Sequence, residues 1–199
     1  LLDDVSVETI LRLAPRFIAE LVDSLCDQVV KTAASQLFAK VIEVLKANEA
    51  ASSGVMRSTV FPSIVASLLR HAQQNGFPTV AKFCIVPLLR LLPSALVSLL
   101  DALSSVNGAS RALSDSQMTV ALIILTVARQ LGILDEEAFA KGEARALITT
   151  VGTKAKAEPA TLPSVPLPLG AGATLSSVIG TCLAHTDEYL VTTALELVC

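Results

Sequence analysis

One stretch, QVVKTAASQLFAKVIEVLKA at residues 28–47, constrains the fold more than any other part of the chain. On a helix drawn at 100° steps, its apolar residues occupy an arc of roughly 220°, whereas a helix that rests on a single neighbour needs only ~100°. A helix with so wide an arc packs between other helices on two sides, so we expect a layered helical fold. The arc contains Val29, Val30, Ala33, Ala34, Leu37, Phe38, Val41, Ile42, Val44 and Leu45.

The rest of the chain also has the patterns of helices. No run alternates apolar and polar residues strictly enough to indicate a strand. Abundant Ala, Leu, Val and Ser, with only 4% aromatic residues, favour helices over an aromatic-rich sandwich. The sequence therefore predicts an all-α protein. Its expected helices lie at about 6–14, 15–25, 28–47, 59–73, 78–92, 94–105, 115–132, 174–184 and 187–199, with a short one after Asp135.

Proline, glycine and small polar residues indicate where these helices should break. Pro15 is expected to interrupt the first helix, and Pro87 to kink the helix that contains it. The sequence ASSG at 51–54 is interpreted as a flexible break. Ser114 or Asp115 is expected to cap the helix that follows. The longest irregular stretch is expected between residues 150 and 173, which are rich in proline and glycine.

Two of the helices share a pattern near their start: Asp, two residues, an aliphatic residue, one residue, Thr, one residue and Ala. The aspartate can cap the helix at its positive dipole end, and the small Ala allows a neighbouring helix to approach closely. The pattern is typical of HEAT-like helical hairpins; the alternative is two ordinary capped helices in a bundle. The two copies are Asp27, Val30, Thr32 and Ala34, and Asp187, Leu190, Thr192 and Ala194.

These features predict a HEAT/armadillo-like α-solenoid segment, in which antiparallel helix pairs stack side by side. The chain begins Leu1-Leu2 without Met and ends inside an apolar helical pattern at Cys199. We interpret it as a single segment, 1–199, of a longer protein. Its expected parts are helical hairpins at about 6–48, 59–106 and 115–147, an irregular loop at 150–173 and a terminal helix pair at 174–199.

Charge, hydropathy and cysteine usage limit the partners and the location. A formal net charge of −3 gives no electrostatic reason to expect DNA or RNA, because their binding proteins carry clustered Lys and Arg. Although 52% of the residues are hydrophobic, we find no signal peptide and no unbroken run of about 20 apolar residues for a membrane span. Dispersed cysteines without CxxC indicate buried reduced thiols in a cytoplasmic protein: Cys26, Cys84, Cys182 and Cys199.

Two short motifs resemble parts of catalytic or cofactor-binding sites but lack the residues that such sites need. GAGATL at 170–175 has two glycines of a dinucleotide-binding loop, but Leu175 stands at the third required position. A proline-rich coil precedes the motif where a strand should be. The Glu136-Glu137 pair suits the start of a helix, and no partner makes it a general-acid pair.

The histidines and lysines are likewise better explained without chemistry. His71 and His185, the only two histidines, fit solvated or capping roles. Lys31, Lys40 and Lys46 form no single basic row, which is typical of a solvated face. We therefore expect a protein that is not an enzyme and that has no catalytic, cofactor-binding or metal-binding residues. Its partner-binding residues stay unassigned.

Three stretches of the chain follow one another in a familiar order. They are FCIVPLLRLLPSALVSLLDAL (83–103), LSDSQMTVALIILTVARQLGIL (113–134) and, after a proline-rich loop, CLAHTDEYLVTTALELVC (182–199). Over about residues 78–199 the chain resembles a portion of the thyroid adenoma-associated protein family. That family includes the large accessory subunit of the eukaryotic tRNA ribose 2′-O-methyltransferase that acts on the anticodon loop. The family's Arg-Arg-Ser-Ala-Gly-Leu-Pro-like run is not found here, so no functional residue is carried across.

The resemblance implies a non-catalytic scaffold that supports tRNA anticodon-loop methylation by binding an FtsJ-type tRNA 2′-O-methyltransferase. Contact with tRNA would then belong to other parts of a full-length protein, and no cofactor, DNA or membrane is expected. The alternative is a generic HEAT-type protein–protein interaction adaptor for transport or trafficking, which binds peptides or proteins in a concave groove. A third hypothesis is a small helical enzyme.

Overall fold

The structure, a computed structural model, describes residues 7–25, 29–72, 77–106, 113–147, 164–169 and 174–199. Its elements are helices except for one two-stranded sheet, so the predicted all-α class is confirmed for these ranges. The helices are α1 (Val7–Ser24), α2 (Lys31–Ala47), α3 (Glu49–Val55), the π-helix η1 (Met56–Val60), α4 (Phe61–His71), α5 (Phe77–Leu91), α6 (Ala95–Ser105), α7 (Asp115–Gln130), α8 (Glu136–Ala140), α9 (Leu175–Leu183) and α10 (Glu188–Val198), and the strands are β1 (Arg145–Leu147) and β2 (Ser164–Pro166).

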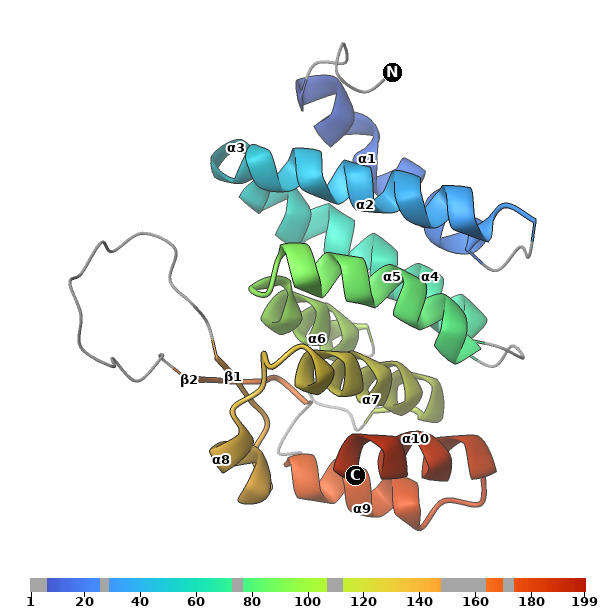
Figure 1. Cartoon of the computed structure of the whole chain (residues 1–199), viewed down its shortest axis with the longest axis vertical. Helices are drawn as coiled ribbons and strands as arrows, with labels where there is room; N and C mark the ends of the chain where they lie inside the picture. Colours follow the sequence, from blue (N-terminus) through green and yellow to red (C-terminus); the bar gives the residue numbers. More distant parts are fainter. Residues whose placement is uncertain (1–6, 26–28, 73–76, 107–112, 148–163, 170–173) are drawn as a thin grey trace, which may run out of the picture.

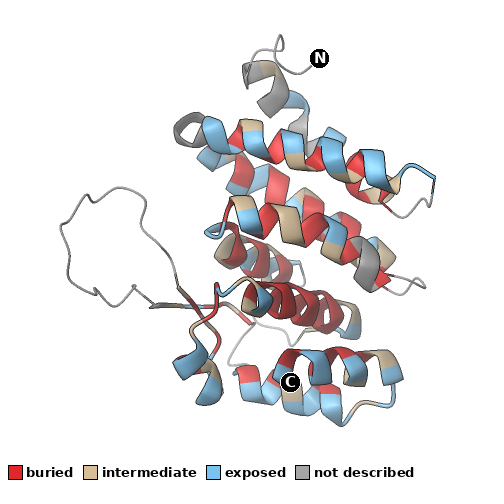
Figure 2. Ribbon diagram, viewed as in Figure 1, coloured by how far each residue is buried: buried red, intermediate tan, exposed pale blue. Residues whose placement is uncertain are grey.

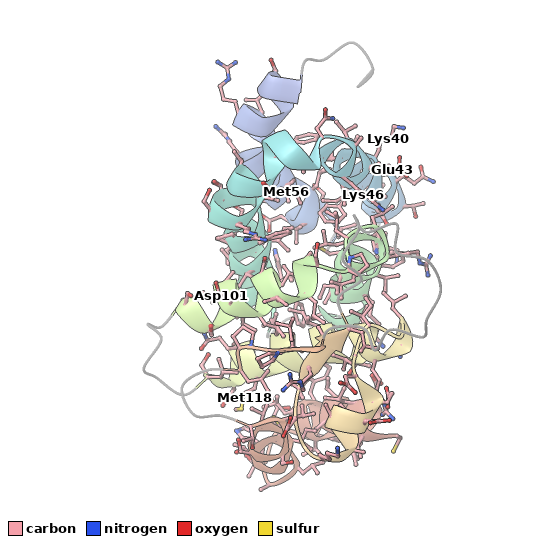
Figure 3. The ribbon with its side chains drawn as sticks, turned by 90° about the vertical axis from the view of Figure 1, so that its left-hand side faces the viewer. Lys40, Glu43, Lys46, Met56, Asp101 and Met118 are labelled. Carbon is pink, nitrogen blue, oxygen red and sulfur yellow. The ribbon has the colours of Figure 1, made fainter. Side chains whose placement is uncertain are left out.

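The long helices lie in two layers (Figure 1). In one layer α1, α4 and α6 contact one another in turn, and in the other α2, α5, α7 and α10 do so. From the side, α1, α4 and α6 lie on the left of the molecule and α2 and α5 on the right (Figure 3). Across the layers α1 packs on α2 and α6 on α7, and α9 packs on α10. The chain therefore builds an elongated stack with its two ends far apart.

α7 is deeply buried, and every residue from Gln117 to Ala128 is inaccessible or nearly so (Figure 2). It contacts α5 and α10 in its own layer and α4 and α6 in the other. A helix that is apolar on all sides is expected to be buried on all sides. This position explains why no charged residue lies between Asp115 and Arg129.

A buried glutamine links the start of α7 to the end of α6. Gln117 is 2% exposed, and its Nε2 donates a 2.8 Å hydrogen bond to the Leu103 carbonyl. Its Oε1 accepts a 2.9 Å hydrogen bond from the backbone N–H of Ser114, whose Oγ accepts one from the N–H of Gln117. These reciprocal bonds form a capping box. Of the two caps expected for this helix, Ser114 is the one used.

Arg129 fastens the other end of α7 to α10. Its Nη1 donates hydrogen bonds to the carbonyl oxygens of Leu197 at 2.6 Å and Val198 at 3.1 Å. These carbonyls lie in the last turn of α10, where the helix itself offers no donor. The guanidinium carbon lies 4.7 Å from the centre of the Phe139 ring, and Nε pairs with Glu136 at 3.2 Å. The Arg129 side chain therefore joins the three helices α7, α8 and α10.

The two copies of the Asp-to-Ala pattern differ at their caps. Asp187 is the N-cap of α10, and its side chain accepts a 2.9 Å hydrogen bond from the N–H of Tyr189, as predicted. Asp27 lies outside the described residues. α2 begins at Lys31, and its N-cap position is occupied by Val30, which has no side-chain cap hydrogen bond. The predicted start of this helix near residue 28 is therefore wrong.

Two predicted breaks are also wrong. α1 runs through Pro15 without interruption, because its packing on α2 and α4 outweighs the ~3 kcal/mol that an internal proline costs. The ASSG sequence at 51–54 lies inside α3, which continues through η1 directly into α4. Ser52 is buried there, and its Oγ donates a 2.8 Å hydrogen bond to the Leu45 carbonyl. This hydrogen bond anchors α3 to the end of α2.

A small antiparallel sheet joins the end of the hairpin predicted at 115–147, where β1 lies, to the loop predicted at 150–173, where β2 lies. In it β1 pairs with β2, and Ala146 lies opposite Val165. The expectation of no strands is therefore wrong, because three-residue strands are too short to show alternation in the sequence. Gly142, in the turn before β1, has a φ of +79°, and a Cβ there would collide with Ser176. Both observations explain why glycine occupies this turn.

The wide apolar arc of α2 is covered only in part. α2 contacts α1 and α5, so it does lie between helices, as its width predicts. Val30 nevertheless stays 41% exposed and Leu37 37% exposed. The covered residues are Ala34, Phe38, Val41, Ile42 and Leu45.

Candidate functional site

An open groove of about 420 Å³ lies where α2 meets α5. Its volume falls within the range of ligand-binding pockets, roughly 300–1,000 Å³. Three apolar residues form its floor, and a hydroxyl group and two cations complete it. We call this surface the α2–α5 groove; its lining residues are Ser35, Lys82, Phe83, Val86, Pro87 and Arg90.

The sequence of α5 explains why one side of this helix is left for the groove. Positions three and four residues apart share a helix face, so Lys82, Phe83, Val86, Pro87 and Arg90 lie together. On the opposite side the helix is anchored in the core by Cys84, Ile85, Leu88 and Leu89, which are all fully buried. The helix therefore carries apolar side chains on both sides, and only one side is covered.

Pro87 also alters the backbone of the groove. α5 continues through Pro87 to Leu91, and proline has no N–H group. The carbonyl of Phe83, four residues earlier, therefore cannot receive the usual helical hydrogen bond from position 87. The kink expected at Pro87 stays a prediction.

Three cations surround the apolar floor. The Nζ atom of Lys31 lies 5.9 Å from the centre of the Phe83 ring, within the range of a cation–π interaction. Lys82 pairs with Glu196 of α10 at 3.5 Å, and Arg90 is exposed. The groove thus joins exposed apolar surface to positive charge.

The positive charge extends along the two helices that form the groove. Lys40 pairs with Glu43 at 3.5 Å, and both project with Lys46 from the outer side of α2 (Figure 3). Glu43 is the only acidic residue within α2 and α5. The basic residues of these two helices are Lys31, Lys40, Lys46, Lys82 and Arg90. This surface is therefore basic on a chain whose formal net charge is −3.

A second hollow, of about 700 Å³, lies on the opposite side of the molecule, beside α6 and β2. Asp101 projects from α6 into this side, away from the lysines of α2 (Figure 3). Arg57, from the π-helix η1, also lines this hollow and adds a cation to it. Its rim includes Val106 and Val165. This hollow carries charges of both signs, whereas the charged lining residues of the α2–α5 groove are both cations.

A polar cluster joins α1 to α4 through His71. The Nε2 atom of His71 lies 2.9 Å from Oδ1 of Asp23, and Nη2 of Arg70 lies 3.0 Å from Oδ2 of the same aspartate. Arg70 also donates a 2.7 Å hydrogen bond to Oγ of Ser67, which is fully buried. A serine without solvent access, held by arginine instead of histidine, is not arranged as a nucleophile. The solvated or capping role predicted for His71 is wrong, since it connects two helices.

His185 has the capping role that the sequence predicts. Its Nδ1 accepts a 3.1 Å hydrogen bond from the backbone N–H of Asp187, in the turn between α9 and α10. Its Nε2 lies 3.5 Å from Oδ2 of Asp115 at the start of α7. This histidine therefore ties the last helix pair to α7.

Burial makes the interior thiols and the tyrosine weak acids. Desolvation raises the pKa of Cys84, and desolvation followed by the nearby Asp115 carboxylate raises that of Cys182. Desolvation is also the main cause that raises the pKa of Tyr189 to about 12. A thiol with a raised pKa is a poor nucleophile. The predicted burial is confirmed for these two cysteines and wrong for the exposed Cys199, and Cys26 lies outside the described residues.

The other motifs have structural roles where they are described. Glu136 and Glu137 open α8, which Asp135 caps. Within the GAGATL motif, Leu175 begins α9 as a buried residue, and residues 170–173 lie outside the described ranges. Over the ranges that the structure covers, no cluster of three His, Cys, Asp or Glu residues has the arrangement of a metal site. Across the same ranges, every helix is too short or too polar to traverse a lipid bilayer.

The sequence pattern of a single helix does not predict the α2–α5 groove. Its cations come from two helices, and the lysines of α2 alone form no row. The available signal was the pattern of α5, in which Lys82 and Arg90 flank Phe83 and Val86 on the side opposite the buried residues. Comparison with known proteins adds no assignment: no family model matches the chain, and neither a curated protein nor a solved structure is significantly similar to it.

Proposed function

We propose that this chain is a segment of a HEAT-like α-solenoid that acts as a non-catalytic scaffold for a protein partner. The observation that carries the proposal is the order of helix contacts. Each helix touches the next helix of its own layer, from α1 through α4 to α6 and from α2 through α5 and α7 to α10. Helix pairs that contact only their neighbours are the defining feature of solenoids.

The resemblance to the thyroid adenoma-associated protein family supports a more specific role. In this role the scaffold binds an FtsJ-type 2′-O-methyltransferase and supports ribose methylation in the tRNA anticodon loop. Its contribution would be positional: a rigid stack holds enzyme and substrate in the productive orientation, which can supply several kcal/mol without any reactive group. The buried thiols of Cys84 and Cys182 and the structural histidines are consistent with such a role.

The α2–α5 groove favours a second candidate, a general protein–protein adaptor for transport or trafficking. An apolar groove rimmed by charge is suited to a peptide segment, whether or not tRNA is involved. The two candidates share the scaffold and differ in the partner.

The decisive experiment is affinity purification of the tagged protein from cells, together with deletion of its gene and mass spectrometry of tRNA anticodon loops. The first candidate predicts that an FtsJ-type methyltransferase co-purifies and that anticodon-loop 2′-O-methylation is lost on deletion. Cargo or coat proteins among the partners, with normal tRNA methylation, would favour the adaptor. Turnover of a substrate by the purified chain alone would contradict both.

A further inference from the structure

We propose that the α2–α5 groove binds an acidic segment of a partner protein, in which an apolar side chain is flanked by carboxylates. The proposal rests on the scaffold function above and identifies the chemistry of what the scaffold holds. The apolar part would lie on Phe83, Val86 and Pro87, and the carboxylates beside Lys82 and Arg90.

Exposed apolar surface is the first argument for an occupant. Phe83 is 37% exposed although the opposite side of its helix is fully buried. Val86 and Pro87 are half-buried beside it, so the floor is a continuous apolar surface. Covering such surface releases ordered water and is favourable, at about 25 cal/mol per Å². The groove is thus a place where an apolar side chain gains free energy by leaving solvent.

Charge identifies the flanks of the occupant. The sequences of α2 and α5 contain five basic residues and one acidic residue, Glu43. Complementary charge guides association and excludes partners of the wrong sign. Lys82 already pairs with Glu196, but this pair is exposed on both sides, at 38% and 51%. Such pairs contribute little, so a partner carboxylate can take the place of Glu196.

The shape and chemistry of the groove favour protein over nucleic acid. Val86 and Pro87 offer aliphatic surface, whereas single-stranded nucleic acids are held by aromatic rings on which bases stack. The one aromatic ring, that of Phe83, already has Lys31 near its face. The Ser35 hydroxyl can both donate and accept a hydrogen bond, so it can bond to the backbone of a peptide. These features together fit a peptide segment with acidic flanks.

The test uses the full chain and a panel of fluorescein-labelled synthetic peptides. Each peptide carries a Phe-Leu or Leu-Leu pair flanked by Glu at varied spacing, with matched analogues in which Gln replaces Glu or Ala replaces the apolar pair. Fluorescence anisotropy should show saturable binding of at least one acidic peptide, weaker binding of both analogues, and weaker binding at high salt. Amide NMR shifts on binding should be centred on Phe83 and Val86.

Three variants separate this groove from general charge effects. Arg90→Glu should weaken binding about fivefold, because it replaces one exposed attraction with a repulsion. Glu196→Gln should strengthen binding about twofold, because it releases Lys82 from its internal partner. Arg57→Glu, on the opposite side of the molecule, makes the same charge change and should leave binding unaltered. Each variant changes an exposed residue, so circular dichroism should show an unchanged fold.

Several results would overturn the inference. They are the failure of every acidic peptide to bind, equal binding of the Gln analogues, or equal weakening by Arg90→Glu and Arg57→Glu. Displacement of the peptide signal by a single-stranded oligoribonucleotide that shifts the same residues would assign the groove to nucleic acid instead. If no acidic peptide binds but a methyltransferase still co-purifies, only the inference about the groove is wrong and the proposed scaffold function is not contradicted. Peptide binding without any co-purifying methyltransferase would contradict only the tRNA role.

Discussion

Gln117→Ala is expected to lower the free energy of unfolding by about 3 kcal/mol. The Gln117 amide donates to the Leu103 carbonyl at 2.8 Å and accepts from the Ser114 N–H at 2.9 Å. Removing the donor leaves the carbonyl without this partner in a buried setting, at a cost of ~1–3 kcal/mol. Losing the capping box costs a further ~1 kcal/mol. The side chain is 2% exposed, so alanine also leaves a space behind.

Urea denaturation followed by circular dichroism measures this loss as a lower transition midpoint with an unchanged slope. Ser116→Ala is the matched control, since it changes the neighbouring residue on the same helix and is expected to alter stability by less than ~0.5 kcal/mol. Equal stability of the two variants would refute the assigned role of the glutamine.

The substitution Gln117→Glu is expected to make the free energy of unfolding depend on pH through this site. The ionised carboxylate can accept from Ser114 but cannot donate to Leu103, and burial raises the pKa of this group above the ~4.3 of an exposed Glu. Because the folded-state pKa is the raised one, the penalty is absent below ~4.3 and grows as the pH rises through the folded-state pKa. The difference from wild type should be small near pH 4 and about 3 kcal/mol at pH 7. A difference that does not vary with pH would contradict the buried hydrogen bond.

Arg129→Lys should lower the free energy of unfolding by about 1 kcal/mol, because lysine keeps the charge but loses the planar contact with Phe139 and the forked donor. Thermal unfolding measures the change. An unchanged Tm would contradict the role assigned to Arg129. For the cysteines, brief iodoacetamide treatment of the native protein followed by peptide mass spectrometry should label the exposed Cys199. Cys84 and Cys182 should react only after denaturation, because both are buried and burial raises their thiol pKa values. Rapid native labelling of Cys84 would contradict the packing of α5.

The helical class could be predicted because it depends on local patterns. The capping residues Asp187 and Ser114 and the uninterrupted apolar run of α7 each act within a few residues of their own position. Such signals survive in the fold because tertiary packing does not oppose them. The predicted starts of α7 and α10 agree with the structure for this reason.

Several of the errors share one physical cause, which is packing between segments that are distant in the sequence. Pro15 is a helix breaker by local propensity, but α1 continues through it and packs on α2 and α4. The ASSG sequence lies in α3, where Ser52 is hydrogen-bonded to Leu45 at the end of α2. The pairing of β1 with β2 joins segments that are far apart in the sequence. The link from His71 to Asp23 is equally distant along the chain. Local patterns carry no information about any of these contacts.

The candidate site was missed for a related reason. Catalytic and metal-binding residues often recur at a fixed spacing, which a sequence can reveal. The α2–α5 groove is instead a surface property, in which Lys31 of one helix lies over Phe83 of another. Only the contact between α2 and α5 turns two amphipathic helices into an apolar groove with a basic rim.

The central claim is that the helices form an open two-layered stack in which α2, α5, α7 and α10 lie along one layer. Zero-length carbodiimide cross-linking of the native chain, followed by peptide mass spectrometry, tests it most directly. Lys82 of α5 should become linked to Glu196 of α10, and Lys40 to Glu43 within α2 serves as the internal control, since both pairs lie at 3.5 Å. A closed bundle that joins α2 to α10 would instead link Lys40 to Glu196, and that product without the Lys82 link would contradict the account.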